Sequence, residues 1–189
     1  LGGLLIGLLL YTSRAGGILQ SKPLYWALNI LVNFVRPIPF IVLIAMLAPV
    51  TVQFVGTTIG RSAAIFVMCI AAAFAVARIV EQNLVAIDPG VIEAARAMGA
   101  SPWRIIRTVI IPEALGPLVL GYTFIFIAVV DMSAMAGYIG GGGLGDFAIV
   151  YGYRAYDLEV TYAAVIVIDI IVQIAQLQGN WLSRRLMRR

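Results

Sequence analysis

The chain alternates between long apolar runs and shorter polar stretches, which is the pattern of a protein that crosses a membrane several times. A transmembrane helix needs about 20 predominantly apolar residues. The apolar runs predict five spans, at residues 1–11, 37–55, 63–80, 115–130 and 162–177. Because the first run is only about half the length of a span, we expect the N-terminal part of that transmembrane helix to be missing from this numbering. The pattern predicts an all-α integral membrane protein with one domain over residues 1–189.

Residues 23–36 have a different pattern, with apolar residues at helical spacing on one face. Asn29, Asn33 and Arg36 line another face. This predicts an amphipathic helix at the membrane surface that leads into the second span. The alternative is one long span that is broken at Pro37.

The polar and charged stretch at residues 86–113 predicts two short helices that meet at a corner between spans three and four. Asp88 is placed to cap the first helix and Pro89 to occupy its first position, where a missing N–H costs nothing. Gly99 is placed to end it, because the residue after a helix often needs a positive φ. The apolar stripe expected on this helix consists of Val91, Ala94, Ala95 and Met98.

The second helix of this segment is predicted to begin at Ser101 as the cap and Pro102 as the first residue. Its apolar face would contain Trp103, Ile106 and Ile110, and Pro112 would stop it. A compact amphipathic corner of this kind suits docking into a groove of a partner. The alternative is a surface loop that only joins two spans, although most connections are a few residues long.

The composition and the charges agree with a membrane protein and orient it. The chain is 62% hydrophobic and 12% charged, whereas a soluble domain averages about 45–50% and about 25%. One side of the expected spans carries most of the cations, including Arg14, Lys22, the arginines of residues 86–113 and those of the C-terminus. Only Arg61 and Arg154 fall on the other side. The positive-inside rule therefore places the corner and the C-terminus in the cytoplasm and the N-terminus outside.

Several classes of chemistry are not expected. The sequence has no histidine and one cysteine, Cys69, so a metal site, a haem site and an internal disulfide are not expected. It lacks the glycine-lysine phosphate loop of nucleotide-binding proteins. Asp131 and Asp169 are interpreted as unrelated membrane carboxylates rather than a proteolytic pair. The sequence therefore predicts neither an enzyme nor a nucleic-acid-binding protein, and no cofactor.

The last two spans contain the candidates for a transport path. Asp169 and Gln173 belong to a polar stripe on one face of the last span, which is completed by Tyr162, Gln176 and Asn180. A carboxylate at this depth must face protein or water. The stripe therefore lines either a subunit interface or transport path, or it bonds locally to a neighbouring helix. Residues 140–143 are four glycines, which form either a flexible loop or, as we expect, a structured segment at the outer mouth. Met135 is a candidate gate residue.

Residues 93–112 resemble the EAA motif of binding-protein-dependent ABC importer permeases. The matching positions are Glu93-Ala94-Ala95, Gly99, Val109 and Ile111-Pro112, although the family more often has Ile and Leu where this chain has Val109 and Ile111. The resemblance implies that this segment is the cytoplasmic coupling helix, which seats in a cleft of a separate ATP-hydrolysing subunit. It also implies that Glu93 contributes to that contact. A weak exposed pair between Glu93 and Arg96 is compatible with this role.

The stretches at residues 29–41 and 133–145 are similar to those of permeases of methionine importers. That resemblance implies a bacterial inner-membrane homodimer, two ATP-binding subunits and an external lipoprotein that delivers the substrate. The alternatives are a permease for another small solute, such as a phosphonate or a polar amino acid, and a channel or structural membrane subunit without an energy source.

Overall fold

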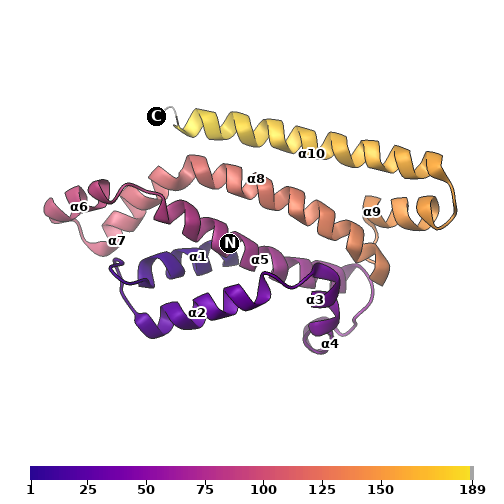
Figure 1. Ribbon diagram of the computed structural model, residues 1–189, viewed down its shortest axis with the longest axis horizontal. Helices are drawn as coiled ribbons and strands as arrows, with labels where there is room; N and C mark the ends of the chain where they lie inside the picture. The colour runs from indigo at the N-terminus through magenta and orange to yellow at the C-terminus, as the bar shows by residue number, and fades with distance from the viewer. Residues whose placement is uncertain (188–189) are drawn as a thin grey trace. The chain divides into compact units, whose positions relative to one another are not determined.

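The computed structural model describes residues 1–187, and within them the chain is helical with no strand. Figure 1 shows the helices in chain order, and the chain divides into two compact units. The first unit contains residues 1–36, 73–123 and 178–187, and the second contains residues 37–72 and 124–177. The all-α prediction is confirmed. Arg188 and Arg189, two of the C-terminal arginines that the positive-inside rule places in the cytoplasm, lie outside the described residues.

Three helices are long and apolar enough to cross a membrane, and each is longer than the apolar run that predicted it. These are α5 (Arg61–Val85), the continuous helix Pro102–Ile139 that contains α8 (Ile111–Ala136), and α10 (Leu158–Met187). A fourth span is obtained only if α2 (Lys22–Val35) and α3 (Phe40–Met46) are counted as one bent pair. The helix α1 (Gly2–Ser13) is apolar but short.

The predicted second span, residues 37–55, is wrong as a single helix. The structure has two short helices there, α3 and α4 (Ala48–Val55), which are separated at Leu47. Pro49 explains the break, because a proline has no N–H and its ring clashes with the carbonyl four residues earlier. The amphipathic segment is a separate helix, α2, which ends before Pro37.

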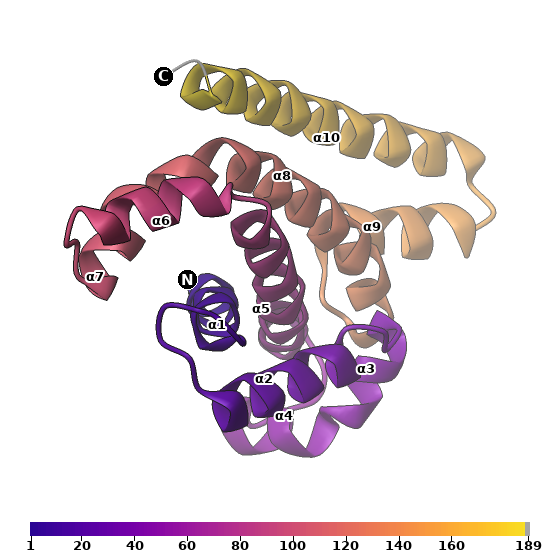
Figure 2. The same cartoon turned by 60° about the vertical axis from the view of Figure 1, so that its left-hand side comes forward.

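In the first unit, α1 lies against α2 and against the C-terminal half of α5 (Figures 1 and 2). Leu10, Val32 and Ala77, one from each helix, form a fully buried cluster. A Cβ atom added at Gly7 would lie 2.5 Å from the carbonyl oxygen of Ala77, and one added at Gly3 would lie 2.5 Å from that of Ala73. Small residues at both surfaces therefore permit the close backbone approach that is common between helices in lipid.

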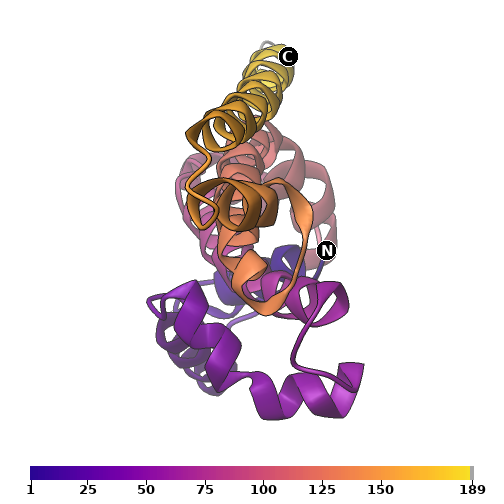
Figure 3. The same ribbon diagram turned by 90° about the vertical axis from the view of Figure 1, so that its right-hand side faces the viewer.

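In the second unit, the glycine-rich segment folds into a defined structure rather than an open loop. The end of α8 passes through a 3₁₀ turn (Gly137–Ile139) into α9 (Gly143–Phe147) and a π-helical segment (Ala148–Tyr153) (Figure 3). The N–H of Gly60 donates to the carbonyl of Ile139 at 2.7 Å. A Cβ atom at Gly145 would lie 2.3 Å from Cα of Ala134, so α9 packs directly on the backbone of α8.

Candidate coupling site

The corner is built by local capping interactions that match the sequence prediction. The Asp88 carboxylate accepts a hydrogen bond from the N–H of Gly90 at 2.8 Å, and Pro89 opens α6 (Pro89–Ala97). At the other end, Gly99 has φ +79°. Its N–H donates to the carbonyl of Arg96 at 2.9 Å, and the N–H of Ala100 donates to that of Ala95 at 3.1 Å. These two bonds are the Schellman pattern, and they fix the direction in which the chain leaves α6.

The helix after the corner begins as predicted but does not stop where predicted. The hydroxyl of Ser101 accepts from the N–H of Arg104 at 3.4 Å, and Pro102 opens α7 (Pro102–Ile105). Helical structure then continues through a π-helical turn (Ile106–Ile110) directly into α8, so the prediction that Pro112 ends the helix is wrong. Local π geometry is one way in which a helix accommodates a proline, and here the π turn immediately precedes it. The corner is therefore joined without a break to a long apolar helix.

The apolar residues of the corner divide between two faces. Ile92 and Ala95 of α6 are buried, as are Ile105, Ile106 and Ile110 of the following segment, and α6 packs against the π turn. Val91, Met98 and Trp103 instead point outward, with 42%, 81% and 68% of their surfaces exposed. The predicted stripe is thus wrong in part, because a short helix that is apolar on most sides offers two stripes, and the structure buries the one through Ile92 and Ala95.

The EAA residues lie mainly on the exposed side of this corner. Glu93, Ala94, Gly99 and Pro112 are exposed, and Ala95 is buried. Glu93 and Arg96 form no salt bridge with each other, since the one salt bridge within residues 1–187 joins Arg78 and Glu81. The Glu93 carboxylate is therefore available to another partner.

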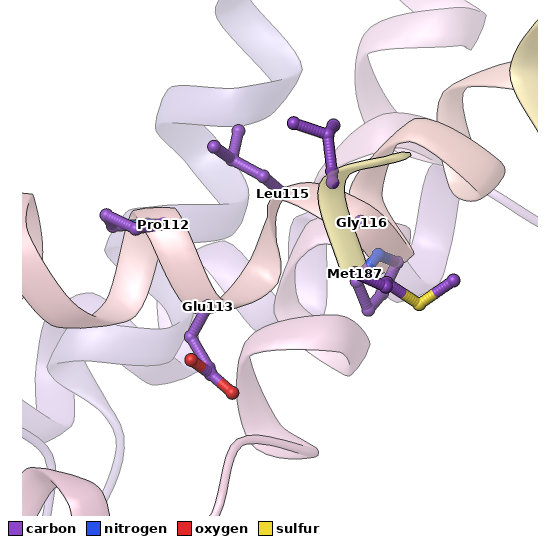
Figure 4. Close-up of a pocket in the computed structure, with 7 residues that line it drawn as sticks. Pro112, Glu113, Leu115, Gly116 and Met187 are labelled. Carbon is purple, nitrogen blue, oxygen red and sulfur yellow. The ribbon is translucent and has the colours of Figure 1, made fainter. Parts of the chain in front are cut away.

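A second contact holds the start of α8 against the end of α10. The hydroxyl of Ser183 donates to the carbonyl of Gly116 at 2.8 Å, and a Cβ atom at Gly116 would lie 2.4 Å from Cγ of Met187. A pocket of about 580 Å³ adjoins this contact (Figure 4). Glu113 extends away from Met187 in this view, so the carboxylate takes no part in the contact.

The candidate path residues are exposed on the second unit. Met135 is 43% exposed near the end of α8, and Asp169 and Gln173 are exposed on α10. Within residues 1–187, the Asp169 carboxylate accepts no hydrogen bond that would satisfy the local alternative.

A polar network between α2 and α5 was not predicted. The Arg78 guanidinium pairs with the Glu81 carboxylate, donates to Oδ1 of Asn29 at 3.0 Å and also donates to Oδ1 of Asn33. The amide of Asn33 donates to Oδ1 of Asn29 at 3.2 Å. The polar face at Asn29 and Asn33 was visible in the sequence, but its partner was not. The sequence signal that could have indicated this network was an arginine and a glutamate three residues apart at the end of an apolar run.

These features define a multi-pass membrane protein with a capped helical corner that exposes apolar side chains and is attached to a long apolar helix. Within residues 1–187, no group of three or more side chains could hold a metal ion. The chain belongs to the family described as binding-protein-dependent transport system inner membrane component, which matches residues 3–189.

Relatives and solved structures agree with this family. The "Probable D-methionine transport system permease protein MetI" of Vibrio cholerae is 43% identical over 187 residues, which cover 99% of this chain and 83% of that protein. The "Methionine import system permease protein MetP" of Bacillus subtilis is 41% identical, with coverage of 96% and 82%. A chain of the MetNI methionine ABC transporter, solved in an inward-facing conformation, matches with a TM-score of 0.92 and 42% identity, over 97% of this chain and 85% of that one.

Proposed function

We propose that the chain is the permease subunit of an ATP-driven methionine importer in a bacterial inner membrane. The named function of its relatives, at 41–43% identity over nearly the whole chain, supports this substrate. The chain itself would perform no bond chemistry, because ATP hydrolysis would take place on a partner subunit.

The exposed apolar face of the corner is the observation that supports contact with an ATP-binding subunit. Val91, Met98 and Trp103 expose large apolar surfaces on a segment that lies between long apolar helices. Burial of apolar area is the main driving force of association, at about 25 cal/mol per Å². The ATP-binding subunit would cover this face, and the exposed Glu93 and Ala94 would lie at its edge.

The proposed topology has five spans, with α1 as the visible part of the first and α3 and α4 together as the second. The remaining spans are α5, α8 and α10. The N-terminus would lie outside, and the corner and the C-terminus would lie in the cytoplasm, where the positive-inside rule places Arg14, Arg96 and Arg104. This arrangement presents the corner to the compartment that supplies ATP.

The permease would act as a homodimer that receives substrate from an external lipoprotein. The exposed carboxylate of Asp169 supports this assembly, since a charge in the membrane faces protein or water rather than lipid. A second copy, or a water-filled path between the copies, would provide that environment for Asp169 and Gln173. Met135 would line the outer end of the path as an adaptable gate.

The proposed mechanism is a shift of population between inward-open and outward-open states. ATP binding would close the ATP-binding subunits and move their grooves, and the rigid corner would pass that displacement to α5 and α8. The helical connection from α7 through the π turn into the start of α8 supports such transmission, because the corner and the start of α8 are joined without an intervening loop.

The test is reconstitution of the permease with its ATP-binding subunit and external protein in liposomes. Radiolabelled methionine should accumulate only when ATP and both partners are present. Accumulation of another solute with no methionine uptake would contradict the substrate. Uptake without the ATP-binding subunit would contradict the class of transporter and favour a channel.

A further inference from the structure

The polar network between α2 and α5 is costly for a membrane helix, and packing does not require it. Arg78 and Glu81 lie in the C-terminal third of α5, and ionisable residues within a transmembrane helix are rare and usually functional. Buried ion pairs are often replaceable by apolar residues without loss of stability. The cluster of Leu10, Val32 and Ala77 already joins α1, α2 and α5. Arg78 and Glu81 therefore point to a role beyond holding these helices together.

The network forms one wall of an open pocket of about 470 Å³. This volume lies within the range of about 300–1,000 Å³ that is usual for small-molecule sites. Five of its six lining side chains are polar or charged, and they come from the end of α2 and the last turns of α5. The lining residues are Asn33, Arg36, Arg78, Glu81, Gln82 and Val85.

The pocket presents groups of both charges to a ligand. Arg36 is exposed, and it has no salt bridge within the part of the chain that the structure describes. Glu81 uses Oε2 to pair with Arg78, and Oε1 has no hydrogen-bond donor among residues 1–187. Glu81 is 6% exposed, and because no buried side-chain nitrogen or oxygen of those residues lacks a partner, Oε1 belongs to the small part of this side chain that is exposed.

We infer that this pocket binds the zwitterionic end of an α-amino acid, as a station for the substrate within the permease. The Arg36 guanidinium, with the free donors of Arg78, would bind the α-carboxylate, since a guanidinium can donate hydrogen bonds to both oxygens of a carboxylate. Oε1 of Glu81, with the amide oxygen of Gln82, would accept from the α-ammonium group. The exposed side chain of Val85 gives the substrate side chain an apolar surface. The inference rests on the proposed function, and it adds the chemical groups that are recognised.

The test measures binding of radiolabelled L-methionine to the assembled complex in nanodiscs, without the external protein. Two competitors each lack one charged group: 4-(methylthio)butanoate has no ammonium, and 3-(methylthio)propylamine has no carboxylate. The zwitterion should bind and both competitors should fail to displace it. Loss of a charge-assisted hydrogen bond should weaken methionine binding by about 10- to 100-fold in Arg36→Gln. Glu81→Gln should also weaken it and should reduce discrimination against the butanoate.

Lys22→Gln is the matched control, because Lys22 is an exposed cation on the same helix outside the pocket. It should bind methionine as the unaltered complex does. Uptake by the complete system in liposomes is measured in parallel. Normal uptake combined with absent binding, or with equal binding by Arg36→Gln, would overturn this inference and leave the proposed function intact. No methionine uptake by the unaltered system would overturn both.

Discussion

The conformation of Gly99 allows a graded test of the corner. Its φ of +79° lies in the left-handed region, and a Cβ atom added there would meet no atom within 4 Å. A substitution at this position is therefore a test of backbone conformation rather than of packing. A non-glycine residue in this region costs about 1–2 kcal/mol, and asparagine is the best tolerated. A β-branched residue costs more, because its side chain is most restricted there.

We therefore expect Gly99→Asn, Gly99→Ala and Gly99→Val to form a series of increasing damage. A cost of about 1–2 kcal/mol changes the ratio between the corner and competing conformations by a factor of roughly 5–30. ATP-driven methionine uptake in liposomes should fall in the order Asn, Ala, Val, and stimulation of ATP hydrolysis by the loaded external protein should fall with it. Membrane insertion and the amount of purified permease should stay constant, because no packing contact is removed.

The result that would refute this reasoning is normal coupled uptake by Gly99→Val. A series that followed side-chain volume rather than tolerance of positive φ would also refute it. Alanine would then be milder than asparagine.

Three further predictions test the packing, the docking face and the polar stripe. Gly7→Leu should lower the free energy of unfolding of the detergent-purified permease by about 1–3 kcal/mol, because its Cβ would lie 2.5 Å from the Ala77 carbonyl oxygen. Gly2→Ala is the control, since a Cβ atom there meets nothing within 4 Å. Equal melting temperatures of the two variants would count against the α1–α5 contact. Trp103→Ala should weaken binding of the ATP-binding subunit by about 2 kcal/mol or more without changing stability, as measured by titration in nanodiscs, and unchanged affinity would remove Trp103 from the interface. Asp169→Leu should reduce dimer recovery in native mass spectrometry or methionine uptake, and a variant that is normal in both assays would restrict the stripe to a local role.

The two ends of α6 and the start of α7 were the most predictable features, because their caps depend on residues adjacent in the chain. Asp88, Pro89 and Gly99 specify their own backbone conformations, and the structure places each as expected. The break at Leu47 had an equally local signal in Pro49, although the apolar run around it favoured one continuous span.

The remaining differences between the predictions and the structure depend on contacts between residues that are not adjacent in the chain. Periodicity could not choose between the two apolar stripes of α6, since the choice depends on packing against the π turn. Pro112 is a helix breaker by local rules, but the π turn before it lets the helix continue. The network of Arg78 and Asn29 joins residues 49 positions apart, and no local pattern reports such a contact.

Cross-linking from the corner tests the central claim most directly. Ala94→Cys, introduced in a Cys69→Ser background to remove the exposed native thiol, places a single reactive group on the exposed side of α6. In native membranes, it should cross-link to the nucleotide-hydrolysing subunit and be labelled from the cytoplasmic side, whereas Tyr156→Cys should do neither. Labelling of position 94 only from the outside, or persistent absence of a cross-link to any nucleotide-hydrolysing chain, would contradict the account.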